Sequence, residues 1–328
     1  MLKYILKRLL YMIPVLFGII VFVFVLKVVT PGDPVDSLLP ATATVEEKQE
    51  LREQLGLDQP ILVQFGNYIW GLVTRLDLGE SYTTRLPVTQ ELFSRFPKTI
   101  VIGLASLLVG QIIANPLGIL AAVKQNTWVD SIIVFFTMVG SALPNFWLAL
   151  MLVTLFSVKL GWLPSMYDGT FASWIMPVIC ASFSAIAATA RGVRTTMLEV
   201  IRQDYIRTAR AKGASEVSVI LNHGFRNTAI PVVAGMGSAL GMLLGGSLIV
   251  ESVFAVPGVG KFITDATTAR NWPIVQGGTI ILSAYNMLIN LLVDVMYTVV
   301  DPRMKTTFVK SKQKKRVAAR TAAAKGGN

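Results

Sequence analysis

The sequence is poor in the residues that build metal sites, disulfides and catalytic centres. It contains one cysteine, Cys180, and one histidine, His223, so it can form no internal disulfide and has no Cys/His metal-ligand spacing. It also has no Ser/His/Asp set and no His-Glu-x-x-His helix. The residues therefore predict neither a catalytic nor a metal site, and they argue against an intramembrane protease or hydrolase.

A motif for ATP hydrolysis is missing as well. The nearest candidate is Gly258-Val-Gly-Lys261. A P-loop needs a glycine where Ala255 stands and a serine or threonine where Phe262 stands, so the match fails. If ATP drives this protein, the ATPase is another chain.

Charged residues are scarce, whereas apolar residues are abundant. Only 15% of the 328 residues are charged and 53% are hydrophobic, with a mean hydropathy of +0.59. A soluble domain carries about a quarter charged residues, and a membrane-spanning helix needs roughly 20 apolar ones. The composition predicts an all-α, polytopic membrane protein with six transmembrane helices, at about 9–29, 99–123, 131–158, 174–195, 229–255 and 275–300.

The first apolar stretch follows Lys3, Lys7 and Arg8, as the core of a signal peptide would. Its apolar run is too long for a signal core, and Pro31-Gly-Asp-Pro34 follows it instead of a small-residue cleavage site. We interpret it as an uncleaved span.

Cations near the ends of the spans predict the orientation, because cytoplasmic loops are enriched in Lys and Arg. The N-terminal arm, residues 191–228 and the tail after residue 300 are rich in cations. Residues 31–97 instead hold ten carboxylates and five cations. Both termini and the 191–228 loop are therefore expected in the cytoplasm. The +11 net charge follows largely from this asymmetry and does not require a nucleic-acid partner, although the basic tail could contact anionic lipid.

Residues 31–97 should form two short helices outside the membrane. Thr44-x-x-Glu47 fits a capping box that would start a helix running to Leu55 and stopping at Gly56. A second, amphipathic helix should start near Pro60 and carry Ile61, Phe65, Ile69 and Leu72 on one side. A lid without a specific role and a docking surface are equally good interpretations of this segment.

Polar residues inside the spans are candidates for a pathway, since such residues usually face a bundle interior or a cavity. Interhelical hydrogen bonding is the alternative, and we favour it for the Asn and Gln residues. Pro144 should bend its helix, and Glu251 and Asp294 are expected to be structural, near span ends where a charge reaches water or a cation. The pathway candidates are Gln111, Asn115, Asn145, Phe146, Ser247, Asn286 and Asn290.

Residues 204–231 make the chain recognisable. Asp204-Tyr-Ile-Arg-Thr-Ala-Arg-Ala-Lys-Gly213, followed by Asn222-His-Gly-Phe-Arg-Asn-Thr-Ala-Ile-Pro231, resembles the cytoplasmic coupling loop of ABC-importer permeases of the dipeptide/oligopeptide family. Pro31-Gly-Asp-Pro34, Val250-Glu-Ser-Val-Phe254 and Asp301-Pro-Arg303 resemble its B-type subunit. Arg207-Thr-Ala209 stands where the general importer pattern has Glu-Ala-Ala, a departure that the peptide subfamily shares.

The resemblance implies the fold of a type I ABC importer and covers about residues 1–305, with 306–328 as a basic, mobile cytoplasmic tail. It implies a multi-pass protein of the bacterial inner membrane that binds no cofactor, with ATP and Mg in the partner chains. Those partners would be a second permease, two ATP-binding subunits and an extracytoplasmic binding protein. The loop, residues 196–228, would dock the ATPases through Asp204, Tyr205, Arg207, Ala209, Arg210, Ala211, Lys212 and Gly213.

Three alternatives stay open from the residues alone. An ion- or proton-coupled secondary transporter or channel often shows repeated halves and mid-membrane ionisable groups, which are not evident here. A membrane-anchored scaffold would not need the polar face formed by Asn286, Asn290 and Asp294. Within the same family, the cargo could be a dipeptide, an oligopeptide, glutathione or a nickel chelate.

Overall fold

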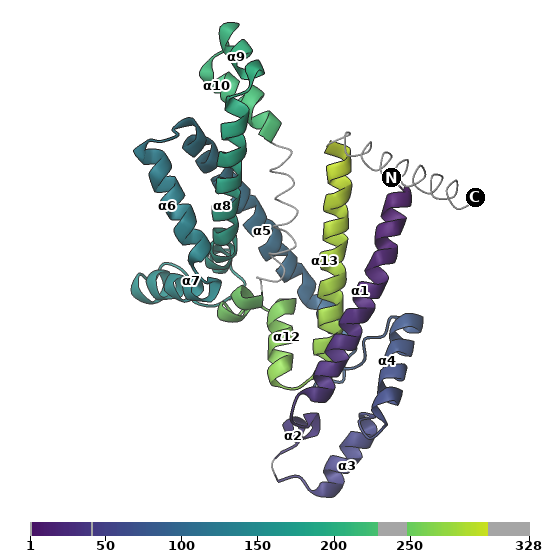
Figure 1. The fold of residues 1–328 in the computed structure, drawn as a ribbon. Helices are drawn as coiled ribbons and strands as arrows, with labels where there is room; N and C mark the ends of the chain where they lie inside the picture. The colour runs from purple at the N-terminus through teal and green to yellow at the C-terminus, as the bar shows by residue number, and fades with distance from the viewer. Residues whose placement is uncertain (1, 41, 229–247, 301–328) are drawn as a thin grey trace, which may run out of the picture.

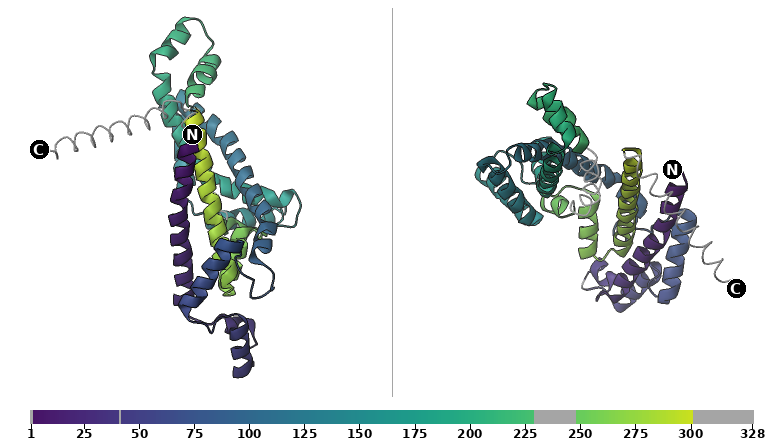
Figure 2. Two further views of the ribbon diagram at one scale, coloured as in Figure 1. Left: turned by 90° about the vertical axis from the view of Figure 1, so that its right-hand side faces the viewer. Right: turned by 45° about the horizontal axis from the view of Figure 1, so that its top comes forward.

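The computed structural model describes residues 2–40, 42–228 and 248–300, and these residues form an all-α fold, as predicted. In Figure 1, α1 (Leu2–Val29) runs beside α13 (Trp272–Val300) on one side of the molecule. On the other side, α6 (Trp128–Ala142) stands beside α8 (Ala172–Ile201), and α5 (Val88–Val123) runs obliquely between the two groups. Figure 2 shows the elongated shape, with short helices beyond the long ones at both ends.

Four helices are long and apolar enough to cross a membrane, and a bent pair of shorter helices makes a fifth candidate span. The four are Ile5–Val29, Val88–Val123, Ala172–Ile201 and Trp272–Val295. They coincide with four of the predicted spans. The span predicted at 229–255 lies largely outside the described residues.

The predicted bend at Pro144 is confirmed, and it breaks the helix. After α6, the chain turns through Leu143 and continues as α7 (Asn145–Leu152) and the π-helical η1 (Val153–Lys159). The two parts are bent by 104°. Proline forces the residue before it out of the helical region, and Leu143 is indeed extended, with φ −73° and ψ 125°. In Figure 1, α7 lies across α6 and α8 instead of prolonging α6.

The closest helix pair is α5 and α8, which pack together over much of their length. A Cβ atom at Gly118 of α5 would lie 2.6 Å from the carbonyl oxygen of Ala190 and 2.7 Å from the Cβ of Val193. Only glycine permits this approach, as at other close crossings of membrane helices. The pair therefore behaves as one packed unit.

Three short helices fold at the end of the spans where α1 ends and α13 begins: α2 (Pro34–Leu38), α3 (Val45–Gln54) and α4 (Ile61–Arg75). The capping box is confirmed: the Glu47 N–H donates to Thr44 Oγ1 at 3.2 Å, and the Thr44 N–H donates to Glu47 Oε2 at 2.8 Å. The start of α4 after Pro60 is also confirmed. The sequence analysis missed α2, whose signal was Asp33, which caps it, followed by Pro34 at its first position.

Glu251 is completely buried, which corrects the expectation that it reaches water. Its carboxylate accepts hydrogen bonds from the Thr99 hydroxyl at 2.8 Å and from the Lys261 N–H at 3.0 Å. It thereby ties α5 to the start of α12 (Val259–Thr268). These contacts support a structural role.

Asp294 has the cation that was expected for it. Its carboxylate lies 2.9 Å from the guanidinium of Arg8, so this ion pair joins α13 to α1. The pair is partly exposed on both sides, and it lies at the opposite end of these helices from α2–α4.

Candidate functional site

The predicted loop forms a compact projection at the end of the molecule opposite α2–α4 (Figure 1). It consists of α9 (Asp204–Ala211), α10 (Glu216–Ser218) and the π-helical η2 (Val219–Phe225). Ile206 and Ala209 of α9 are buried and pack with Val219, together with the partly buried Val200 and Ala214. The loop thus has a small hydrophobic core of its own.

Gly213 ends α9 with a left-handed turn. Its φ is +79°, its N–H donates to the Arg210 carbonyl at 2.9 Å, and the Ala214 N–H donates to the Ala209 carbonyl at 3.3 Å. This pair of bonds, with Ala209 and Ala214 in contact, is the Schellman arrangement, which favours glycine at the left-handed position. A Cβ atom here would meet nothing within 4 Å, so conformation and not crowding requires the glycine.

The outward face of α9 is polar and largely cationic. The side chains of Asp204 and Arg207 are 98% and 76% exposed. Tyr205, Ala211 and Lys212 are also exposed, whereas Ala209 faces inward and is not available for close approach by a partner. The face therefore offers an aromatic ring and exposed cationic groups to whatever binds it.

Arg210 serves the loop itself. Its guanidinium donates to both carboxylate oxygens of Glu216, at 2.7 and 3.3 Å, which holds the end of α9 to α10. The same hydrogen bonding raises the pKa of Arg210 above its usual value, so the group stays charged. Arg210, one of the predicted docking residues, is thus already paired with Glu216 inside the loop.

Two contacts connect the loop to the spans. The loop continues directly from α8, and Gly224 of η2 lies against Met197 of α8; a Cβ atom at Gly224 would be 3.3 Å from the Met197 Cε. Met197 is in turn buried with Ala122 of α5 and Val193 of α8. These contacts join the loop to the packed α5–α8 pair.

An ion pair that the sequence analysis missed lies at the base of the loop. The Arg194 guanidinium of α8 donates to both oxygens of Asp130 at the start of α6, at 2.6 and 2.7 Å. The Asp130 side chain is only 6% exposed. The two residues are 64 positions apart, so no local pattern could pair them. This contact links α6 to the same helix that carries the loop.

The structure places the described pathway candidates in three groups. In α5, Asn115 donates to Gln111 at 3.3 Å, and in α13, Asn290 donates to the Asn286 side chain at 2.7 Å. Both are contacts one turn apart in a single helix. The third group is Asn145 with its neighbour Phe146.

Asn145 lies at the break between α6 and α7 and accepts a hydrogen bond from Ser184 of α8 at 3.1 Å. Phe146 beside it is exposed. The Asn145 contact is interhelical, which is the kind of contact that we favoured for the Asn and Gln residues, whereas the two contacts in α5 and α13 are not. Ser247 lies outside the described residues.

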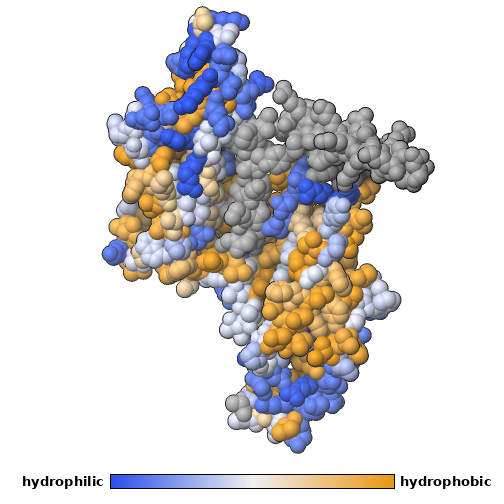
Figure 3. Space-filling view, in the orientation of Figure 1, coloured by the Kyte–Doolittle hydropathy of each residue, from blue (hydrophilic) through white to orange (hydrophobic). Residues whose placement is uncertain are grey.

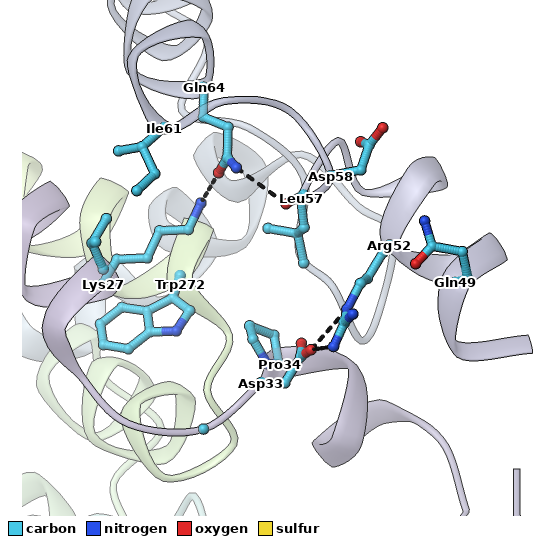
Figure 4. Close-up of a pocket in the computed structure, with 12 residues that line it drawn as sticks. Lys27, Asp33, Pro34, Gln49, Arg52, Leu57, Asp58, Ile61, Gln64 and Trp272 are labelled. Carbon is cyan, nitrogen blue, oxygen red and sulfur yellow. Dashed lines mark hydrogen bonds and ion pairs between the residues drawn. The ribbon is translucent and has the colours of Figure 1, made fainter. Parts of the chain in front are cut away.

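At the other end of the molecule, a hollow of about 690 Å³ opens between the ends of α1, α3 and α4 and the start of α13. Figure 4 shows Lys27 reaching across it to Gln64, with Nζ 3.0 Å from Oε1, and Trp272 in its wall. On its far side, Arg52 of α3 pairs with Asp33, with Nε 2.8 Å from Oδ2. These contacts hold the short outer helices in place.

Known proteins match nearly the whole length of the chain. Residues 114–306 match the family described as binding-protein-dependent transport system inner membrane component, and residues 1–103 match the N-terminal region of the corresponding membrane component. The glutathione transport system permease protein GsiC of an Escherichia coli strain is 41% identical over 305 residues, which is 93% of this chain and 99% of GsiC. GsiC of Salmonella choleraesuis is 40% identical over the same shares.

A solved structure shares the fold. The inward-facing MetNI methionine ABC transporter superposes with a TM-score of 0.54 at 20% sequence identity. The match covers 65% of this chain and 97% of the other.

Proposed function

The chain belongs to the family of binding-protein-dependent transport system inner membrane components, and from this premise we propose that it forms half of the translocation pathway of an importer for short peptides. It is a non-catalytic permease subunit of an ABC importer in the inner membrane. The family implies ATPase subunits and a binding protein as partners. A second, homologous permease would complete the pathway.

The proposed cargo is a peptide of two to a few residues. The observation that supports it is the 40–41% identity, over almost the full length, to permeases named for glutathione, which is itself a small peptide. Glutathione is therefore the first cargo to test, beside dipeptides and oligopeptides. A nickel chelate is the alternative within the family, and titration of the partner binding protein with each class would decide between them.

The proposed coupling element is α9 with its outward face. This face leaves Tyr205, Arg207 and Lys212 accessible, while Ile206 and Ala209 anchor the helix to its own core. A surface built this way can bind an ATPase without losing its fold. Coupling requires a physical element whose two positions both partners bias, and the direct continuation of α8 into α9 supplies one.

The proposed orientation places the loop and both termini in the cytoplasm and α3 outside. The test uses two single-cysteine variants, Glu50→Cys and Lys310→Cys, each in a Cys180→Ser background. Intact cells that carry each variant are treated with a membrane-impermeant thiol reagent. In intact cells we expect labelling at position 50 only. Labelling at 310 and not at 50 would refute the orientation.

The coupling proposal is tested at Gly213. Gly213→Val places a β-branched residue at a positive φ, which costs roughly 1–2 kcal/mol and should distort the end of α9. We expect normal membrane insertion, weakened capture of the ATPases and loss of uptake.

Gly213→Asn is the matched control, because asparagine tolerates the left-handed conformation and should keep most of the activity. Arg207→Glu should act in the same direction, but less strongly, since an exposed ion pair contributes only about 0–1 kcal/mol. Wild-type co-purification and uptake with Gly213→Val would show that this loop is not the coupling element.

A further inference from the structure

Helix α4 has three distinct faces. Phe65 and Leu72 are half-buried on the face toward α1. Gln64, Asn67 and Tyr68 line a hollow of about 530 Å³ between α4, α3, α1 and the start of α13. The third face is apolar and uncovered: Leu62 is 83%, Trp70 70% and Val73 74% exposed.

The position of α4 along α1 sets its depth. Gln64 is bonded to Lys27 near the end of α1, the Phe65 ring lies 4.9 Å from that of Phe24, and Leu72 packs in the cluster that contains Val23. The partly buried Ile19 packs against the same cluster. Helix α4 therefore runs antiparallel to the last turns of α1, and all of these turns belong to the candidate span Ile5–Val29. Its C-terminal half lies deeper along the span than its start.

The polar side chains of α4 make hydrogen bonds within the segment, and Thr74, one turn after Trp70, is a hydroxyl that borders the uncovered face. Gln64 donates to the Gln59 carbonyl at 2.8 Å, Asn67 donates to the Gln59 side chain at 3.2 Å, and the Thr74 hydroxyl donates to the Trp70 carbonyl at 2.6 Å. The one charged residue in the helix is Arg75. Because it follows Val73 by two residues, it points about 200° around the helix from Val73.

Helix α3, only a few residues earlier, is instead highly charged and exposed. It carries six charged side chains, Glu46, Glu47, Lys48, Glu50, Arg52 and Glu53, and buries none of its residues. Figure 3 shows hydrophobic surface extending over α1 and α4 and giving way to hydrophilic surface beyond them, at α2 and α3. On this side the surface thus changes from charged to apolar between α3 and α4.

We propose that α4 is inserted in the leaflet at this end of the spans, with Leu62, Trp70 and Val73 in contact with lipid acyl chains. The surface is continuous with the exposed apolar side of α1, where Phe22 is 63% and Val25 48% exposed. Tryptophan is enriched at membrane interfaces, which suits Trp70 near the middle of the helix. The segment between the first two long helices is then an aqueous helix, α3, followed by a helix embedded in the membrane.

Nitroxide labels test the proposal. Leu62→Cys, Trp70→Cys and Val73→Cys, each in a Cys180→Ser background, would be spin-labelled in the assembled transporter in lipid nanodiscs. Accessibility to oxygen, which concentrates in lipid, is compared with accessibility to a water-soluble nickel chelate. Glu50→Cys in α3 is the matched control for water.

We expect the three α4 labels to show an oxygen-to-nickel ratio several-fold above that at position 50, increasing from position 62 to position 73. High nickel accessibility at these sites would place α4 in water and overturn the proposal. Low accessibility to both reagents would also overturn it, because it would mean that a protein partner covers the face. The accessibility measurements do not depend on which cargo the transporter carries.

Discussion

The two ends of the molecule are built differently, although both consist of short helices outside the longest ones. The α9–η2 loop has a separate small core of Ile206, Ala209 and Val219, and its charged face is open. The outer helices instead share a core with the spans: Leu72 and Tyr82 pack with Val23 of α1 and Trp272 of α13. Two ion pairs, Lys48–Asp36 and Arg52–Asp33, also tie α3 to the start of α2.

The outer pairing is illustrated by Asp36. Its carboxylate lies 2.8 Å from the Lys48 ammonium, and this hydrogen bond lowers the pKa of Asp36 below its usual range. By contrast, Arg207 of the loop lies 3.8 Å from Asp204, and both are highly exposed. The loop therefore combines a core of its own with a highly exposed charged surface, which suits an element that binds a partner. The outer end is a fixed extension of the bundle.

This contrast predicts that changes within the packed bundle reduce stability most, and the largest loss is expected for Glu251→Ala, at the contact between α5 and α12. The change removes the acceptor for the buried Thr99 hydroxyl and the Lys261 N–H and leaves a cavity, at a cost of about 3 kcal/mol. Thermal unfolding of the purified transporter measures it. Glu251→Gln keeps one carbonyl oxygen and should lose clearly less. Equal stability of the alanine variant and the wild type would contradict the assigned role.

At the loop end, Arg194→Leu should affect transport as well as stability. It leaves Asp130 nearly buried without its partner, and we expect a loss of roughly 2 kcal/mol, less than for a fully buried pair, because Arg194 is a quarter exposed. ATPase capture should persist, since α9 is untouched, while uptake falls. The control is Asp130→Asn combined with Arg194→Leu: additive losses would show that the pair does not couple α6 to α8.

Local patterns were read correctly from the sequence, whereas contacts between distant segments were not. The capping box of Thr44 and Glu47 and the bend at Pro144 each depend on neighbours within a few residues, and each is confirmed. The Arg194–Asp130 pair and the burial of Glu251 depend on how helices pack. Nothing in the local sequence specifies that packing.

Helix α4 likewise shows that packing between distant segments could not be predicted from the local sequence. Its start and its half-buried residues Phe65, Ile69 and Leu72 followed from helical periodicity, whereas Ile61, predicted on the same side, is 53% exposed. Leu62 and Val73 are three turns apart and so share the second apolar face. This face was not predicted because the segment between the spans was expected to lie outside the membrane. Only the packing of α4 on α1 places that face at the depth of the membrane.

Asn271→Ala should destabilise the outer end by about 1–2 kcal/mol. Asn271 is 2% exposed, accepts the Tyr82 N–H at 3.1 Å and donates to Ser81 Oγ at 3.0 Å, which fixes the turn before α5 to the start of α13. Thermal unfolding is again the measurement. Thr268→Ala, where the hydroxyl bonds within its own helix, is the control and should stay near wild type. If both variants unfold at the same temperature, the turn is not part of the shared core.

The smallest effect is expected at Thr44, where the comparison predicts a purely local change. Thr44→Ala removes the side-chain bond to the Glu47 N–H, at a cost of about 1 kcal/mol to α3. Because α3 buries none of its residues, that loss should not spread to the spans. Hydrogen exchange at residues 45–55 should accelerate about fivefold while thermal unfolding of the whole protein stays unchanged. Thr44→Ser retains the acceptor and should exchange like the wild type. A drop in the unfolding temperature as large as that of Asn271→Ala would show that α3 belongs to the rigid outer core after all, and that the boundary between its aqueous and membrane-packed parts lies elsewhere.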